Sequence, residues 1–507
     1  MAAAKILSLD ALEKQASDLR GNGKRVVMCH GTFDLMHTGH IRHLQRARHE
    51  GDLLLVTVTA DAYVNKGPGR PVFPEDLRAE TLAALACVDF VSIDHEPTAV
   101  NAISRLRPHV YAKGSEYRVS ADDVTGNIER EQRAVEDCGG EIFYTDEITF
   151  SSSSLLNEHF GVLSAEARDY LQEFRKKYSF KDIINLVKGL ADLKVLVVGD
   201  AIIDQYHYVK VLGQVGKGTV LSVKYESDEQ FAGGALAVAN HLAGFANAVT
   251  LVTGLGTIDT YEAFIRSKLL PNVTPRFFEV DNAPTITKRR FVDEDLTKLF
   301  EVYFCSEEPM SVEVDDAVCG WLEANLKAFD VVIVPDFGNG FISPNMIDVL
   351  CRSARFLGVN TQLNSGNRGH HVINRYPRAD FVSINEPELR LAAHNRHDPL
   401  ELVAETIGKR VHSDHIAITY GAKGAMFKNR KSGAVHYVPA LSTKVLDRIG
   451  AGDAFLAVAG LCIGGGLPSE IAAYVGSASA ALEVQIVGNR ESMDSVTLFK
   501  YITTLLK

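Results

Sequence analysis

The stretch from His30 to His40 constrains the fold more than any other part of the chain; it reads His-Gly-Thr-Phe-Asp-Leu-Met-His-Thr-Gly-His. An apolar run, Val26–Cys29, precedes it, and a helical pattern begins at Ile41. The order predicts a strand, a tight glycine turn and the start of a helix. Strand-like and helical segments go on alternating along the whole chain, which indicates an α/β fold with parallel sheets flanked by helices.

Two histidines, His37 and His40, fall three residues apart on the first turn of the expected helix and therefore share a face. Gly39 between them lets a phosphate approach the backbone. Free N–H groups at a helix N-terminus favour an anion, and two imidazoles there can donate to phosphate oxygens as charge moves during transfer. The alternative is that these histidines merely cap a surface helix.

This segment resembles the His-x-Gly-His signature of the cytidylyltransferase-like nucleotidyltransferases, and the resemblance extends to about residue 160. It implies a mobile basic loop around Lys66, an arginine at Arg78 and a lysine–glycine step at Lys113. It also implies that the hydroxyls of Phe150–Leu156 open a helix facing the nucleotide phosphates, although Leu156 replaces the usual arginine. Without the resemblance, four serines are more often a flexible linker.

The resemblance assigns two sets of residues to nucleotidyl transfer. Catalytic roles are expected for His37, His40, Lys66 and Arg78. Nucleotide contacts are expected from Gly31, Thr32, Phe33, Gly39, Lys113, Ser151, Ser152 and Ser153. Attack of a sugar phosphate on a nucleoside triphosphate needs in-line positioning and charge neutralisation, but no covalent enzyme intermediate. Magnesium on the triphosphate is expected, because it neutralises charge without dedicated protein ligands.

A second signature lies at residues 447–455, which read Asp-Arg-Ile-Gly-Ala-Gly-Asp-Ala-Phe and lead into an apolar helix. The small residues Gly450, Ala451 and Gly452 leave backbone N–H groups bare, which forms an anion hole at a helix N-terminus. Asp453 stands where it could accept the proton of an attacking hydroxyl. The alternative is an aspartate that only caps the helix after glycines.

This part of the chain, over about residues 190–507, resembles the ribokinase-like sugar kinases. The resemblance assigns the sugar side to Asp204, Gly233, Gly234 and Asn240. It assigns the nucleotide side to Asn385, Glu388, Thr419, Gly421 and Gly424, together with Gly450, Ala451 and Gly452. Glu388 would act on magnesium indirectly.

The two resemblances together are those of the bifunctional heptose-phosphate kinase/adenylyltransferases, which make ADP-heptose for bacterial lipopolysaccharide, with the order of the halves reversed. Gln205 stands where an arginine is usual, and Asn339 and residues 361–369 lack two expected lysines, of which Arg368 could replace one. A substrate other than the same heptose 7-phosphate is therefore expected, and the kinase activity could be weak or lost.

Composition narrows the function classes. A formal net charge of −11 argues against nonspecific nucleic-acid binding. The seven cysteines include no Cys-x-x-Cys pair, which argues against a zinc site or a disulfide framework and suits a reducing cytoplasm. No apolar run approaches the roughly 20 residues of a membrane span. We therefore expect a cytoplasmic homo-oligomer that binds small molecules.

We therefore expect a Rossmann-like nucleotidyltransferase domain at residues 1–160, a helical linker at 161–190 and a ribokinase-like domain at 191–507. The predicted function is phosphorylation of a sugar or sugar phosphate, followed by transfer of a nucleotidyl group. ATP is slightly favoured as the nucleotide, and CTP stays possible for the N-terminal half. Two alternatives stay open: a kinase-like half that only senses a sugar or nucleotide, and an oligomeric scaffold in a polysaccharide pathway.

Overall fold

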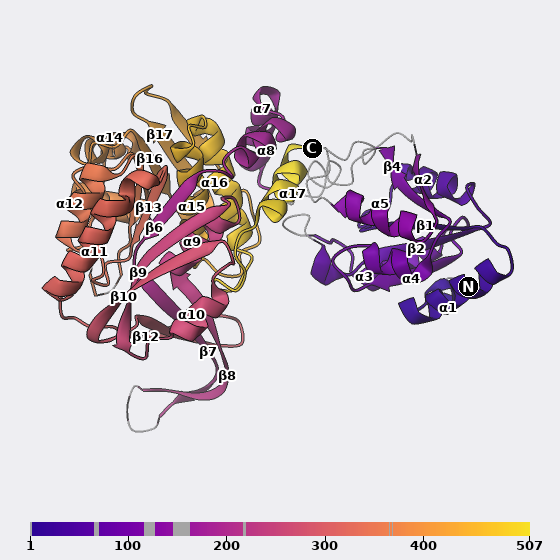
Figure 1. Ribbon diagram of the computed structural model, residues 1–507, viewed down its shortest axis with the longest axis horizontal. Helices are drawn as coiled ribbons and strands as arrows, with labels where there is room; N and C mark the ends of the chain where they lie inside the picture. Colours follow the sequence, from indigo (N-terminus) through magenta and orange to yellow (C-terminus); the bar gives the residue numbers. More distant parts are fainter. Residues whose placement is uncertain are drawn as a thin grey trace. The chain divides into compact units, whose positions relative to one another are not determined.

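The computed structural model describes residues 3–64, 70–115, 127–145, 163–215, 218, 220–364, 366–367 and 369–507. The chain divides into two units, residues 1–162 with 499–507 and residues 163–498. Each has its own central sheet (Figure 1). We call them the transferase unit and the kinase unit.

The transferase unit is built on a five-stranded parallel sheet in the order β3-β2-β1-β4-β5. Its strands are β1 (Val26–Gly31), β2 (Leu53–Thr59), β3 (Phe90–Asp94), β4 (Val110–Gly114) and β5 (Glu141–Thr145). The order reverses between β1 and β4, and a reversal of this kind places a ligand crevice at the carboxyl ends of the two strands.

Helices cover both faces of this sheet. Val26 and Met28 belong to a core cluster with residues of α1 (Leu9–Gly21), α4 (Val100–Leu106) and α5 (Asn127–Asp137). Val27 and Cys29 belong to the other cluster, with residues of α2 (Thr38–Arg48) and α3 (Glu75–Ala83). The alternation follows from the two-residue period of a strand, and both faces being covered explains why β1 is apolar throughout its first four positions.

A nine-stranded sheet forms the centre of the kinase unit, in the order β10-β9-β6-β13-β14-β15-β16-β17-β18. Its strands are β6 (Lys194–Val198), β9 (Ala248–Ile258), β10 (Val273–Pro284), β13 (Val331–Asp336), β14 (Leu357–Thr361), β15 (Phe381–Asn385), β16 (His415–Thr419), β17 (Ala425–Asn429) and β18 (Val435–Val438). The pairs from β10 to β16 are parallel, and the last two pairs are antiparallel.

This sheet is also covered on both faces. Buried residues of α11 (Val312–Asn325), α12 (Pro344–Ser353), α13 (Glu386–Ala393) and α14 (Leu400–Arg410) form one core cluster with Val332 and Val334. The other face carries α9 (Ala235–Ala243), α15 (Ala451–Gly464) and α16 (Ser469–Glu483). Gly460 of α15 lies so close to Ile333 that an added Cβ would stand 2.8 Å from its Cδ1. Helix α10 (Glu262–Lys268) also belongs to the kinase unit. Most of α17 (Ser495–Leu506), from residue 499 on, belongs to the transferase unit.

A separate four-stranded sheet, β12-β11-β7-β8, supplies part of the kinase site. The long strands β7 (Ala201–Gln214) and β8 (Leu221–Gly234) form an antiparallel hairpin. Strand β11 (Thr287–Val292) runs parallel to β7, and β12 (Lys298–Phe304) pairs antiparallel with β11. The register sets Lys288 opposite Asp204.

The expected helical segment after residue 161 is present as α7 (Ala165–Lys177) and α8 (Phe180–Lys188). The ring of Phe174 lies 4.4 Å from that of Tyr474 on α16, measured between centroids. Lys177 pairs with Glu470, also on α16, at 2.8 Å. We infer that α7 is part of the kinase unit and not a free connector, while the boundaries at 160 and 190 stay predictions.

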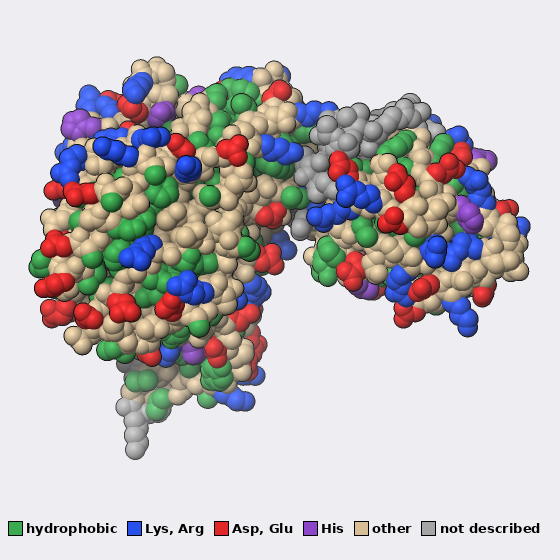
Figure 2. All heavy atoms as spheres, viewed as in Figure 1, with side chains coloured by type: hydrophobic (Ala, Val, Ile, Leu, Met, Phe, Trp, Pro, Cys, Tyr) green, Lys and Arg blue, Asp and Glu red, His purple; other side chains and the backbone are tan. Residues whose placement is uncertain are grey.

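Two observations concern membrane spans and surface charge. In the described part of the chain, no helix has both the length and the apolarity needed to cross a membrane. On the face drawn in Figure 2, basic and acidic side chains of the described residues are interspersed.

Replacing Phe174 by Ala should lower the free energy of unfolding of the kinase unit by about 3–5 kcal/mol, because it removes a buried ring that packs on α16. Urea unfolding followed by the fluorescence of Trp321 measures this, since the chain has one tryptophan and it lies on α11. The exposed neighbour Glu173→Ala is the matched control. Equal midpoints for the two variants would show that α7 adds nothing to the kinase unit.

Candidate active sites

The histidine signature forms the turn between β1 and α2. His37 is the N-cap of α2, and the Gly39 N–H donates to its Nδ1 at 3.1 Å. With Nδ1 used as an acceptor, the neutral ring carries its proton on Nε2. This Nε2 is shielded from solvent and has no hydrogen-bond partner among the described residues. Burial lowers the pKa of His37, so the ring is neutral near pH 7.

His40 stacks on His37, with ring centroids 3.9 Å apart and an interplanar angle of 30°. Phe33 meets His40 edge-on at 5.6 Å, and its φ of 48° lies in the left-handed region. A bulky residue held there reflects a turn whose shape the surroundings fix. The structure therefore brings together the three rings of the signature at the carboxyl end of β1, while their roles stay predictions.

Arg78 is bound by protein groups on every nitrogen of its side chain. Its side chain is fully buried, and its Nε donates to Phe73 O at 2.9 Å. Its two terminal nitrogens donate to the carbonyls of Thr32 and Thr59, and one also to Asp61. Every nitrogen of the guanidinium is thus bound to protein. In this structure Arg78 holds the turn after β1 against the end of β2, and its expected catalytic role stays a prediction.

An ion pair that the sequence did not reveal fixes the same turn. Asp34 accepts hydrogen bonds from Val72 N at 2.7 Å and Phe73 N at 3.1 Å, and it pairs with Arg70 at 3.3 Å. Both side chains of the pair are buried. Asp34 belongs to the signature motif, so the sequence could have marked it as a site residue. Its partner Arg70 follows a loop, and residue spacing does not identify it. The predicted residue Lys66 lies outside the described residues, as do Ser151, Ser152 and Ser153.

Lys113, expected at the nucleotide, is bound to an acid. Its ammonium pairs with Glu131 of α5 at 2.8 Å, and the Tyr111 hydroxyl donates to the same carboxylate at 3.1 Å. The side chains of Lys113 and Tyr111 both project from the face of the sheet that α5 covers. A lysine neutralised in this way would have to exchange its partner to bind a phosphate.

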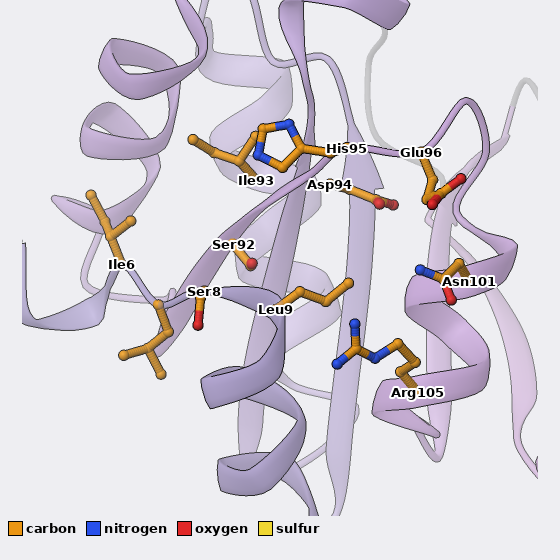
Figure 3. A pocket seen from close by; sticks show the side chains of 11 residues that line it. Ile6, Ser8, Leu9, Ser92, Ile93, Asp94, His95, Glu96, Asn101 and Arg105 are labelled. Carbon is orange, nitrogen blue, oxygen red and sulfur yellow. The ribbon is translucent and has the colours of Figure 1, made fainter.

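Further polar groups are buried at the strand ends. The His30 ring lies between the hydroxyls of Thr57 and Thr59, and burial lowers its pKa to about 3. Asp94 ends β3, and burial raises its pKa to about 6. A cavity of about 460 Å³ opens beside this strand end, between the start of α1 and α4, from which Arg105 projects (Figure 3). It is lined by none of the predicted site residues.

In the kinase unit, Asp453 lies in the first turn of α15. The N-cap is Gly450, whose φ of 87° is a left-handed conformation that glycine adopts without strain. Burial, then the charge of Asp204 and that of Glu388 raise the pKa of Asp453 to about 7, while Lys288 lowers it. A carboxyl with this pKa can accept a proton near neutral pH.

Asp204 lies against Gly233 of the sugar-side element. An added Cβ at Gly233 would stand 2.0 Å from Asp204 Oδ2, so a larger residue would displace this carboxylate. Gly234 has a φ of 60° and precedes α9. Asp204 also forms a buried ion pair with Arg290 of β11. Its carboxylate is therefore already neutralised in this structure.

Asn240, also expected on the sugar side, is used inside the fold. Its Nδ2 donates to Lys268 O at 2.9 Å, and its Oδ1 accepts from Leu270 N at 3.0 Å. Both bonds tie α9 to the chain after α10. Asn240 holds the scaffold in this structure through both ends of its amide, and its expected substrate contact stays a prediction.

The sequence did not mark Lys288 as a site residue, yet it lies where the two sides of the kinase site meet. It is 6% exposed and its pKa is lowered, mainly by burial. Its charge acts on Asp200, on Asp453 and on Asp204. The only signal for it was its place in the Thr-Ile-Thr-Lys run.

The nucleotide-side motif at α13 is a complete capping box. Asn385 Oδ1 accepts from Glu388 N at 2.8 Å, and Glu388 Oε2 accepts from Asn385 N at 2.8 Å. The other oxygen of Glu388 accepts from Leu363 N at 3.1 Å. Burial raises the pKa of this carboxyl.

The expected nucleotide turn follows β16, which ends at Thr419. Gly421 and Gly424 have φ values of 64° and 97°. An added Cβ at Gly424 would stand 2.0 Å from Val438 O, so this glycine is required by the close approach of β18. Arg368, the expected lysine replacement, lies outside the described residues.

The loop that contains Asn339 is fixed by buried acids. Asp200 accepts from Phe341 N at 3.2 Å and from Asn339 N at 3.4 Å. Burial, with the nearby charge of Asp336, raises the pKa of Asp200 to about 6. Asp336 in turn accepts from the Tyr376 hydroxyl at 2.8 Å.

Family models match both halves. The model of the pfkB family carbohydrate kinases matches residues 192–496, which is more than half of the chain. The chain belongs to the pfkB carbohydrate kinase family. The cytidylyltransferase-like model matches residues 28–158. The predicted fold class, a Rossmann-like nucleotidyltransferase domain followed by a ribokinase-like α/β domain, is confirmed.

Curated relatives resemble part of the chain. It is 41% identical over 141 residues to the bifunctional protein HldE of Geobacter sulfurreducens, which is 27% of each chain. It is 40% identical over 152 residues to the bifunctional protein HldE of Methylobacillus flagellatus, or 30% of each. The chain thus spans less than a third of the length of these relatives, and the matches fall in the cytidylyltransferase region.

Solved structures with some likeness include two ribokinases. The Thermotoga maritima enzyme has a TM-score of 0.49 at 19% identity, covering 61% of this chain and 99% of that one. The Arabidopsis thaliana enzyme, complexed with ribose and ATP, has a TM-score of 0.47 at 19% identity, with 61% and 99% coverage.

His37→Ala should slow nucleotidyl transfer about 10²-fold or more, because it removes the donor that we expect to meet a phosphate oxygen. Pyrophosphate release from a nucleoside triphosphate and a sugar phosphate measures this. His49→Ala, an exposed histidine that follows the same helix, is the matched control and should keep the parent rate. Pyrophosphate release at the parent rate by His37→Ala would remove the transferase assignment.

Proposed function

We propose that the protein is a bifunctional sugar-activating enzyme. The kinase unit would transfer the γ-phosphoryl group of ATP to a hydroxyl of a sugar or sugar phosphate. The transferase unit would join a nucleotidyl group to a sugar phosphate, releasing pyrophosphate. The pfkB and cytidylyltransferase-like matches support the pairing of these two chemistries in one chain.

The arrangement around Asp453 is the observation that carries the kinase proposal. Behind the Gly450-Ala451-Gly452 turn, Asp453 lies in the field of Asp204 from the sugar side and of Glu388 from the nucleotide side. The N–H groups at the start of α15 would bind phosphate oxygens. Asp453 would accept the hydroxyl proton as the sugar oxygen attacks the γ-phosphorus and ADP leaves.

The turn at His37 supports the transferase proposal. Its unpartnered Nε2 is buried at the start of α2, and an unpaired buried polar atom costs about 1–3 kcal/mol. A phosphate oxygen accepting from it would offset that cost. Because the rings of His37 and His40 stack with centroids 3.9 Å apart, the two would lie beside the same phosphate.

Nucleotides are the substrates of both matched families, and we propose ATP for the kinase unit and ATP, or alternatively CTP, for the transferase unit. Magnesium would arrive with the triphosphate. The described residues contain no group of three or more His, Cys, Asp or Glu side chains placed to hold a metal. Both oxygens of Glu388 accept backbone N–H groups, so this residue does not fit as a direct ligand.

We propose a heptose-like sugar phosphate as the acceptor, on the resemblance of the transferase half to the HldE proteins. Gln205 and Asn339, at positions where arginine and lysine are usual, argue for a variant of that substrate. Lys288, buried and charged beside Asp204, supports an acceptor that carries negative charge.

A second candidate function is a nucleotidyltransferase whose kinase-like unit senses a sugar or nucleotide without turning it over. The buried pair of Asp204 with Arg290 favours this reading, because the expected sugar ligand is already engaged. Separate measurement of the two activities distinguishes the two candidates.

Asp453→Asn should abolish sugar phosphorylation and leave pyrophosphate release from a supplied sugar 1-phosphate intact. Asparagine is nearly isosteric with aspartate, and the N-cap of α15 is Gly450, so the helix start should hold. Asparagine cannot accept the hydroxyl proton. Both activities are measured on one preparation, with the exposed Asp316→Asn as control. Phosphorylation that persists in Asp453→Asn would show that the base lies elsewhere, and no phosphorylation by the parent over a broad sugar panel would favour the sensing module.

The pH profile gives an independent check. The pKa of Asp453 is raised to about 7, so the base is protonated and inactive below that pH. The kcat/KM of sugar phosphorylation should therefore rise as pH increases from 6 to 8. A kcat/KM that is flat over this range would contradict a base with a raised pKa.

A further inference from the structure

A buried acid at the end of α16 is used by no part of the mechanism above. Glu483 is the last residue of this helix and is fully buried. Neither of its carboxyl oxygens has a hydrogen-bond partner among the described residues. The side-chain oxygen of Asn489 close by is likewise without a partner in that part of the chain. Burying an ionised carboxylate without partners is costly, so such a group is under pressure to stay neutral.

These oxygens lie against the first residue of the proposed anion hole. An added Cβ at Gly450 would stand 2.9 Å from Glu483 Oε1 and 2.5 Å from Asn489 Oδ1. Gly450 is the N-cap of α15, where the free N–H groups would meet a phosphate. A negative charge directly behind this turn would oppose the charge of a triphosphate in front of it.

Three acidic residues on neighbouring segments act on Glu483. Burial is the first cause that raises its pKa, followed by the charges of Asp453 on α15, Asp447 before α15 and Glu491 after α16, and the result is about 8. Asp447 is itself neutralised by Lys298, at 2.8 Å. Glu483 is therefore mostly protonated at pH 7 and ionised above pH 8.

We propose that Glu483 is a positioning residue that sets nucleotide affinity at the kinase anion hole. As the neutral acid it leaves the hole to the triphosphate, and as the carboxylate it repels the triphosphate. ATP binding at alkaline pH therefore takes one proton from the buffer and places it on a Glu483 oxygen. This inference rests on the proposed binding of ATP by the kinase unit.

The effect follows from linkage between proton and nucleotide. If bound ATP keeps Glu483 protonated, the Kd for ATP should rise about 10-fold between pH 7 and pH 9, because the free protein must first regain a proton. Asp453 adds a share of its own, so the effect of Glu483 is read as the difference between the parent and a variant that changes only residue 483.

Isothermal titration of ATP into the full chain tests this, at pH 7 and pH 8.5 and in two buffers of different ionisation enthalpy. Glu483→Gln and Glu483→Met should take up less proton at pH 8.5 than the parent and bind ATP more tightly there, with parent-like affinity at pH 7. The exposed Glu491→Gln is the matched control and should behave nearly as the parent. The transferase site is identical in all proteins, so the differences report the kinase unit.

The outcomes separate the inference from the function on which it rests. ATP binding whose affinity and proton uptake at pH 8.5 are the same in parent and Glu483→Gln would overturn the role of Glu483 alone. A loss of ATP affinity at both pH values in a variant that keeps the parent's unfolding temperature would also overturn it. Gly450→Val changes the anion hole itself. If its ATP titration were identical to that of the parent, the anion hole would not bind ATP, and the kinase assignment would be overturned as well.

Discussion

The N-terminus of a helix is the feature on which the proposed chemistry of both units depends. In the transferase unit it is the start of α2 behind β1, and in the kinase unit it is the start of α15. Backbone N–H groups at a helix start favour an anion without a cradle of many charged side chains. An acidic chain would therefore still be able to bind a triphosphate at these two places.

Burial then sets the protonation states that the chemistry needs. His37 is neutral because desolvation lowers its pKa, so that it donates a proton in a hydrogen bond without carrying charge. Asp453 and Glu483 have raised pKa values because burial and the charges of neighbouring acids act together. If Asp453 is the base and Glu483 the neutral acid that we propose, the kinase unit would work in a narrow range of pH in which both are in the useful form.

The local features of the sites were predictable from the sequence. The turn at His37 and His40 and the glycine turn before Asp453 are continuous motifs whose geometry follows from their own residues. Contacts between segments that are distant in the sequence were not predictable from it. The four hydrogen bonds that occupy Arg78 come from three other segments, and the pair of Lys113 with Glu131 joins a strand to a helix. No spacing rule reveals such partners, because tertiary packing alone decides them.

The central claim is that nucleotide phosphates bind at the two helix starts. A crystal structure of the full chain with a non-hydrolysable ATP analogue and magnesium tests it most directly. The account predicts phosphate oxygens within hydrogen-bond distance of the backbone N–H groups of Gly450–Gly452 and of the Nε2 atom of His37. Nucleotide bound with its phosphates away from both helix starts would contradict it.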